Sequence, residues 1–577
     1  MEEELLVLNM AILLLLGGGC SILFKHFKMP VVIGYLVSGI IIAAVGWPTD
    51  ETIEIVEFLS DIGLALMMFC IGMELNLTKL RRMGSFAILV VMIQVPIILI
   101  GGIVLGGMLL GLDSLQALIF GAIISGSSTA VVTIVLADQK NMSHSDVETL
   151  ILVTVVEDVF QVLILSAISP LMSGNSMELD GIIWMFVLIV AFMITSIVIG
   201  IAMIPKGLDW LHKKMPAELL VIIGLGICFG MAYLSITIGM SMAIGAFLAG
   251  VITSQSNNAS KTIEEHVTPM KDVFMMMFFI SIGMEISVGG IVNNILAILI
   301  IYGIYFLLKF SSVILAYFVG NKPMSLAYHS SIALVAMGEF AFIISKEALS
   351  AGIIDNDFYT AVIGAALLSM IILPVINSQN KKVIDTFTYK SPGVLQNTYH
   401  RIDVWRGTVY DRISSISKST QNKFKTGLAT VYVNVFIILI IEIIFIMANA
   451  DITEFVNDHT PESMSQYICS IVVLLLNFLA LIPSLFFIVR HMMFIQRIML
   501  DAERRAIRAG EKQGYSIGMK IMRFFVRRNN WLLIIIFDFM ILLITPNNVD
   551  FIGHLIVLIS GAVLIVITLL YGFIRRS

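Results

Sequence analysis

The chain of 577 residues is 58% hydrophobic and only 13% charged, with a formal charge of −5 and a mean hydropathy of +0.99. This composition excludes a soluble globular domain and predicts an all-α polytopic membrane protein. The net charge says little about partners, because the placement of Lys and Arg between spans carries that information.

Apolar stretches of membrane-spanning length succeed one another along the chain, separated by short polar connectors. Up to residue 380 they predict about thirteen transmembrane helices, near 3–24, 30–46, 54–76, 84–111, 114–137, 147–171, 181–204, 217–235, 238–254, 269–286, 290–318, 323–349 and 357–377. A basic cytoplasmic linker, 381–428, should follow. An additional module, 429–577, should hold about four more spans, near 429–449, 467–489, 531–546 and 553–573.

The charges of the connectors alternate along the chain. Basic residues cluster at 25–28, 79–82, 206–214 and 381–382, whereas acidic residues cluster at 50–51, 178–180 and 355–357. Because Lys and Arg mark cytoplasmic connectors, we expect a multi-pass protein of the cell membrane with its N-terminus outside and its C-terminus in the cytoplasm. The basic segment 490–528 suits a helix lying on anionic lipid, or ordinary cytoplasmic flanking charge.

The chain repeats itself at a constant offset of 211 residues. Val31–Ile41 and Met242–Ile252 share the pattern I-G-x-x-x-x-G, and Ile71–Glu74 matches Ile282–Glu285. An odd number of spans separates matching segments, so the two halves should have opposite topology, as in many secondary transporters. Chance similarity between Gly-rich apolar segments is the alternative, but separate blocks sharing one offset argue against it.

Two neighbouring carboxylates, Glu157 and Asp158, interrupt the apolar span 147–171. Asp158 lies about 18 Å from either end of that helix, at the bilayer midplane. An ionisable side chain at this depth costs about 2.5–3.5 kcal/mol or more, so it normally marks an ion or proton pathway. Thr154 shares a helix face with Asp158, and Gln161 shares one with Glu157.

Polar residues also interrupt the span 114–137, where Ser127, Ser128 and Thr129 lie at mid-depth and opposite the interruption at Met337–Phe340 in the repeat. Such a segment can unwind and offer carbonyl and hydroxyl oxygens to a cation. A small-residue packing face is the alternative.

Lys309 lies too deep in the span 290–318 to reach the membrane surface easily. A buried Lys needs a carboxylate, and Glu157 or Asp158 is the obvious candidate. The alternative to a transport role is a static ion pair that holds two helices together.

Segments across residues 1–380 together resemble the monovalent cation:proton antiporter-2 family, which includes bacterial sodium/proton antiporters and glutathione-gated potassium efflux systems. Any one segment is weakly specific, whereas the set is specific. The similarity is carried by Pro30–Gly39, Gly63–Arg82, Ser127–Ala130, Phe278–Met284 and Gly338–Phe342.

The resemblance implies an inverted-repeat antiporter fold with two crossed discontinuous helices, arranged as a homodimer. It matches Asp158 to the family's ion- and proton-binding aspartate and Lys309 to its basic residue. Glu157 departs from the pattern, because relatives more often carry Asp, Asn or Gln there, which leaves ion choice and stoichiometry open. Beyond residue 380 the resemblance ends, and no G-x-G-x-x-G loop of a soluble nucleotide-binding domain occurs.

We therefore predict a secondary antiporter in the lipid bilayer that exchanges Na⁺ or K⁺ for H⁺ by alternating access, with cation and proton competing for Asp158. We expect Glu157, Ser127, Ser128, Thr129 and Thr154 to bind the ion or proton together with Asp158, and Lys309 to act as the charge partner. Two alternatives are a ligand-gated potassium efflux protein and a sensor or scaffold that reuses the fold. An enzyme is not expected, since no nucleophile–base set, Walker loop or metal cluster is visible in the sequence. We also expect no cofactor, no resident metal and no nucleic-acid partner.

Overall fold

The computed structural model describes residues 2–389, apart from 28, 48–49, 76–84, 138–141, 173–178 and 257, together with scattered helical residues between 423 and 497. Every regular element in this part of the chain is an α-helix, which confirms the all-α prediction. The chain divides into two compact units, one made of residues 1–105, 118–316 and 328–379, the other of 106–117, 317–327 and 380–577. The site described below lies within the first unit.

Up to residue 380 the helices follow the apolar stretches expected from the sequence, and each stretch coincides with one helix or with a pair. Among the described residues, nine helices are long and apolar enough to cross a membrane, and α2 and α11 are shorter apolar helices. In chain order the helices are α1 (Glu2–His26), α2 (Val31–Val45), α3 (Asp50–Glu74), α5 (Ser85–Leu110), α6 (Ser114–Ile123), α7 (Thr129–Ala137), α8 (His144–Met172), α9 (Leu179–His212), α10 (Ala217–Thr237), α11 (Met242–Thr253), α12 (Ala259–Met284), α13 (Val288–Asn293), α14 (Ile295–Val319), α15 (Met324–Ala333), α16 (Glu339–Ser350) and α17 (Asn356–Tyr389).

Some boundaries differ from the expected ones. Helix α12 begins at Ala259 rather than near 269, because its first turns carry Lys261, Glu264 and Glu265, which lower the hydropathy without breaking the helix. The stretch expected as one span over 290–318 is divided at Asn294 into α13 and α14.

At the C-terminal end, α17 continues to Tyr389, past the expected domain boundary at residue 380. The rest of the expected linker 381–428, and most of the expected module 429–577 with its basic segment 490–528, lie outside the described residues. Within that module, Leu479–Phe494 is an apolar helix.

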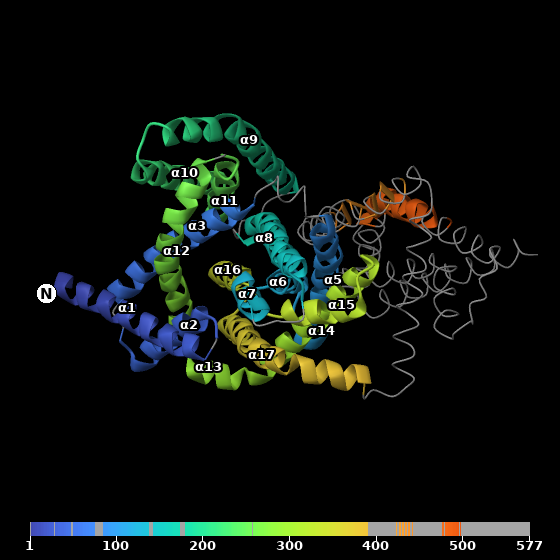
Figure 1. Ribbon diagram of the computed structural model, residues 1–577, viewed down its shortest axis with the longest axis horizontal. Coiled ribbons are helices and arrows are strands. Elements are labelled where there is room, and N and C mark those ends of the chain that lie inside the picture. The colour runs from blue at the N-terminus through green and yellow to red at the C-terminus, as the bar shows by residue number, and fades with distance from the viewer. Residues whose placement is uncertain are drawn as a thin grey trace, which may run out of the picture. The chain divides into compact units, whose positions relative to one another are not determined.

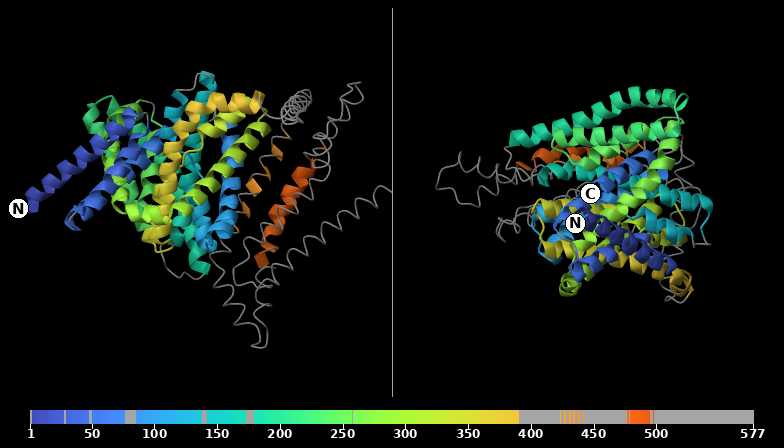
Figure 2. Two further views of the ribbon diagram at one scale, coloured as in Figure 1. Left: turned by 90° about the horizontal axis from the view of Figure 1, so that it is seen from below. Right: turned by 90° about the vertical axis from the view of Figure 1, so that its left-hand side faces the viewer.

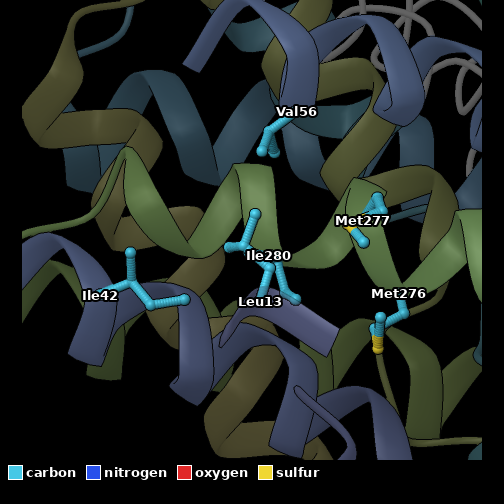
Figure 3. Packing of buried hydrophobic residues seen from close by; sticks show 6 residues of the cluster. All are labelled: Leu13, Ile42, Val56, Met276, Met277 and Ile280. Atoms are coloured by element: carbon cyan, nitrogen blue, oxygen red, sulfur yellow. The ribbon is translucent and has the colours of Figure 1, made fainter. Parts of the chain in front are cut away.

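One group of helices, here called the scaffold helices, consists of α1, α2, α3, α10, α11 and α12 (Figure 1). Helix α12 packs along α2 and α3, α11 packs along α3 and α10, and α1 packs along α2. Helix α9 lies beside α10, as both sets of views show (Figures 1 and 2). Buried Leu13, Ile42, Val56 and Ile280 join Met276 and Met277 in a hydrophobic cluster that binds α1, α2, α3 and α12 together (Figure 3).

Glycines at repeat-related positions let the scaffold helices make the same crossing twice. A Cβ atom on Gly39 of α2 or on Gly283 of α12 would overlap backbone of the other helix, and Gly72 of α3 and Gly250 of α11 are in the same relation. The offset of 211 residues carries Gly39 to Gly250 and Gly72 to Gly283, so the first pair of helices maps onto the second. The repeat inferred from the sequence is therefore present as repeated packing.

We expect Gly283→Ala to lower the thermal stability of the purified protein, since α2 and α12 must separate to admit the methyl group. Overpacking of this kind costs about 1–3 kcal/mol. Gly18→Ala in α1 is the matched control, because a Cβ atom there meets nothing within 4 Å. Thermal unfolding followed by size-exclusion fluorescence in detergent measures both, and equal melting temperatures for the two variants would contradict the close crossing.

The second group, the core helices, consists of α5 to α8 and α14 to α17. Helix α8 packs against α7 and α16, and Gly102 of α5 lies against Gly121 of α6. Two apolar spans in this group are broken: one between α6 and α7, the other between α15 and α16. Both breaks occur at the polar interruptions seen in the sequence.

Candidate functional site

The two helix breaks are joined to each other by backbone hydrogen bonds. Ser127 and Met337 pair in an isolated antiparallel bridge, and Ser128 N–H donates to the Ala336 carbonyl oxygen at 2.9 Å. The Ser127 hydroxyl donates to the Leu334 carbonyl oxygen at 2.8 Å. Because α7 and α16 both begin at this crossing, two helix N-termini with positive partial charge meet there.

Neighbouring helices satisfy other polar groups of the crossing. The buried Tyr305 of α14 has its hydroxyl 3.3 Å from the Gly126 carbonyl oxygen and 3.2 Å from that of Leu334. Ser369 of α17 accepts a hydrogen bond from Met337 N–H at 3.0 Å. Within a membrane, irregular backbone is tolerated only when protein groups or cavity water satisfy its N–H and carbonyl groups. These contacts therefore stabilise the two breaks in the helices.

Glu157 of α8 is fully buried and bonded to three donors. Its Oε2 lies 2.9 Å from Lys309 Nζ and accepts from Ser127 N–H at 2.8 Å, while its Oε1 accepts from the Gln94 side-chain amide of α5. Lys309 is also fully buried. Of the two carboxylates proposed as its partner, the structure therefore places Glu157 beside Lys309.

Asp158, one residue further along α8, has a different environment. Its Oδ2 accepts a hydrogen bond from Thr129 Oγ1 at 3.2 Å, whereas its Oδ1 is buried and has no hydrogen-bond partner in the structure. The side chain is 4% exposed. A buried carboxylate oxygen without a partner is costly, so of the two adjacent carboxylates Asp158 is the one with spare capacity for a proton or a cation.

The remaining residues expected at the site have separate roles. Ser128 Oγ lies 3.4 Å from Glu339 Oε1 and also accepts from Val131 N–H. The Thr154 hydroxyl donates to the Ile151 carbonyl oxygen of its own helix at 2.9 Å. The structure thus brings Ser127, Glu157 and Lys309 together, and joins Thr129 to Asp158, while Thr154 uses its hydroxyl within α8.

Sequence reasoning missed several polar groups around the crossing. Gln94, a single amide in an apolar run, and Tyr305 carried no spacing signal that pointed to this site. Glu339, the first residue of α16, is not among the site residues expected from the sequence, yet it lies within electrostatic range of Asp158. A signal for Glu339 existed, because Ser128 and Glu339 are matching positions of the repeat.

Two half-helices that cross beside a buried carboxylate pair, within an inverted repeat, define the class of secondary transporters. The family model described as "Sodium/hydrogen exchanger, transmembrane" matches residues 11–378, and the chain belongs to this family of multi-span membrane transporters. The resemblance found in the sequence is thereby confirmed.

Curated relatives agree with the family. The chain is 28% identical to K(+) efflux antiporter 5 of Arabidopsis thaliana, over 64% of this chain and 66% of that protein, so it spans just under two thirds of that relative. It is 30% identical to the Na(+)/H(+)-K(+) antiporter GerN of Bacillus cereus, over 62% of this chain and 91% of that one. The solved sodium proton antiporter MjNhaP1 of Methanocaldococcus jannaschii matches with a TM-score of 0.53 and 17% identity, over 66% of this chain and 98% of that one, which supports the fold.

Proposed function

We propose that this protein exchanges a monovalent cation for protons across a membrane by alternating access, with Asp158 as the shared binding group. The observation that carries the proposal is the partner-free Oδ1 of the buried Asp158 at the crossing of two broken helices. The names of the relatives, which include Na⁺/H⁺ and K⁺ antiporters, support the same class of substrate.

Competition at Asp158 provides the coupling. A lone carboxylate at the membrane midplane is expensive unless a positive charge neutralises it, and a single carboxylate holds either a proton or a dehydrated cation. Binding of one ion therefore expels the other. The Thr129 hydroxyl and polar atoms near Ser127 and Ser128 would replace part of the water shell of the cation, while Glu157 and Lys309 neutralise each other nearby.

The wider arrangement is part of the proposal. We infer a main transporter domain over 1–380, a cytoplasmic linker over 381–428 and a further transmembrane module over 429–577. The alternating charges of the connectors support insertion in the cell membrane with the N-terminus outside. Assembly as a homodimer follows the family resemblance.

Proton flux in proteoliposomes tests the function. Na⁺, K⁺ or Li⁺ is added to acid-loaded vesicles, with and without a clamped membrane potential, and the internal pH is followed. Cation-dependent alkalinisation is the expected result, and the active cation identifies the substrate. An unchanged internal pH with every cation would overturn the antiport proposal, while cation conduction without proton movement would point to gated efflux.

Thr129→Val should weaken the apparent cation affinity about tenfold, because it removes the side-chain hydrogen bond to Asp158, and hydrogen bonds to charged groups contribute about 1.5–3 kcal/mol. Thr154→Val makes the same replacement where the hydroxyl bonds its own helix, and we expect a smaller loss. The concentration of cation that gives half-maximal flux measures both variants. A larger loss for Thr154→Val would move the binding site along α8.

A further inference from the structure

A pair of neighbouring charged residues on α16 ties the core helices to the scaffold helices. Glu285 is the residue directly after α12, and its Oε1 lies 3.0 Å from Lys346 Nζ. Lys346 Nζ also lies 3.2 Å from the hydroxyl of Ser281, which belongs to α12. Tyr359 of α17 donates to the other oxygen of Glu285 at 2.8 Å. Two core helices, α16 and α17, therefore both bind the carboxylate of Glu285.

Glu347, the next residue of α16, makes a second tie. Its Oε1 accepts a hydrogen bond at 2.6 Å from the hydroxyl of Ser241, which caps the N-terminus of α11. Lys346 and Glu347 thus bind two different scaffold helices. Asp61 of α3 lies within electrostatic range of both. We call the Lys346–Glu285 and Glu347–Ser241 contacts the latch.

The repeat duplicates the acidic residues of the scaffold helices but not the charged residues of α16. The offset of 211 residues relates Glu285 to Glu74 and Asp61 to Asp272, so the scaffold carries matching acids at both ends of the repeat. It also relates Lys346 to Val135 and Glu347 to Leu136. These two residues are apolar, and the described helix α7 holds no charged residue at all.

The acid that matches Glu285 has different neighbours. Glu74 is exposed in the structure, and among the described residues Lys271 on scaffold helix α12 and Glu339 on core helix α16 lie within its electrostatic range. Lys271 in turn lies 3.3 Å from its neighbour Asp272. Among the described residues, the ion pair of Lys271 therefore stays within the scaffold, and what links it to the core helices is a longer-range attraction to Glu339 of α16.

We propose that Lys346 and Glu347 are positioning residues that form a one-sided latch, which closes the route to Asp158 at the Glu285 end and favours the conformation open towards Glu74. This inference rests on the proposed function, because a preference between two openings presupposes alternating access. The connector charges place the Glu285 end outside, so the latch biases the transporter towards opening inwards. Among the described residues, the matching positions of α7 hold no base, so that part of the chain shows no comparable ion pair at the Glu74 end.

Hydrogen–deuterium exchange of the full chain in lipid nanodiscs tests the latch. In Glu285→Gln and in Lys346→Gln, amides of 241–253 and 339–350 should exchange about fivefold faster than in the wild type, at the low end of typical conformational couplings. Lys271→Gln is the matched control, because it removes a lysine whose ion pair, with Asp272, stays within the scaffold. The double exchange Glu285→Lys with Lys346→Glu should bring the rates back towards the wild type.

Unchanged exchange in both single variants would overturn the proposal, as would an equal acceleration along all core helices, which would indicate general loosening. If Lys346→Gln does not fold, Tyr359→Phe removes one hydrogen bond to Glu285 and should accelerate exchange at the same two segments. The measurement uses neither a cation gradient nor transport. If no cation drives proton flux but the variants exchange faster, antiport is rejected and the latch contacts are supported. If proton flux is observed but the variants exchange at the wild-type rate, only the latch is rejected.

Discussion

Asp158→Asn is expected to abolish cation-dependent proton movement while leaving the protein folded. Asparagine has nearly the same shape and can still accept a hydrogen bond from Thr129, so packing around α8 is retained. It carries no charge, however, and can neither take up a proton in the transport range nor neutralise a dehydrated cation. Flux in proteoliposomes should fall to the level of protein-free vesicles.

A second measurement separates loss of binding from loss of fold. A bound cation stabilises the folded state by mass action, so the wild-type melting temperature should rise with the transported cation, and that of Asp158→Asn should not. Asp146→Asn, near the start of the same helix, is the matched control, because its carboxylate accepts a local, exposed hydrogen bond from the Ser143 hydroxyl and lies far along α8 from the crossing. Undiminished transport in Asp158→Asn would refute the assignment of the site.

Lys309→Ala is expected to produce the largest loss of stability of the variants considered. The change leaves Glu157 fully buried without its cationic partner, and breaking a buried ion pair from one side costs about 3–5 kcal/mol. Thermal unfolding in detergent measures the effect. Lys261→Ala, an exposed lysine of α12, should leave the melting temperature close to that of the wild type.

A double variant tests the physical reason for that loss. Glu157→Gln combined with Lys309→Met removes both charges and keeps similar volumes, and replacing a whole buried ion pair is often close to neutral. The double variant should therefore recover most of the stability lost in Lys309→Ala. If it is as unstable as Lys309→Ala, the cost arises from lost packing at Lys309 rather than from the stranded carboxylate.

Up to residue 380, periodicity and polar interruptions in the sequence were enough to predict most of the helices and the two breaks at the crossing, but not the division at Asn294. The constant offset of 211 residues also predicted the repeat. The structure agrees, since the glycines that this offset relates are those at which the scaffold helices cross. These features depend on local composition and on spacing along one chain, which a sequence displays directly.

The partners of individual side chains could not be predicted in the same way. Glu157 and Asp158 are adjacent, and one residue turns a helix by about 100°, so the choice of Lys309 between them depends on how α14 lies against α8. Gln94 and Tyr305 contact the crossing from helices that are distant in the sequence. Their roles depend on tertiary packing, which no spacing rule encodes.

The bridge between Ser127 and Met337 has a mechanical consequence. The two interrupted spans come from opposite halves of the chain, yet they share backbone hydrogen bonds at the point where both lose helical structure. A push on either span is transmitted directly to the other, so the pair should travel as one stiff body. In the exchange proposed above, an ion bound beside this pair would move with it while the binding site keeps its shape, and release would depend on which side admits water.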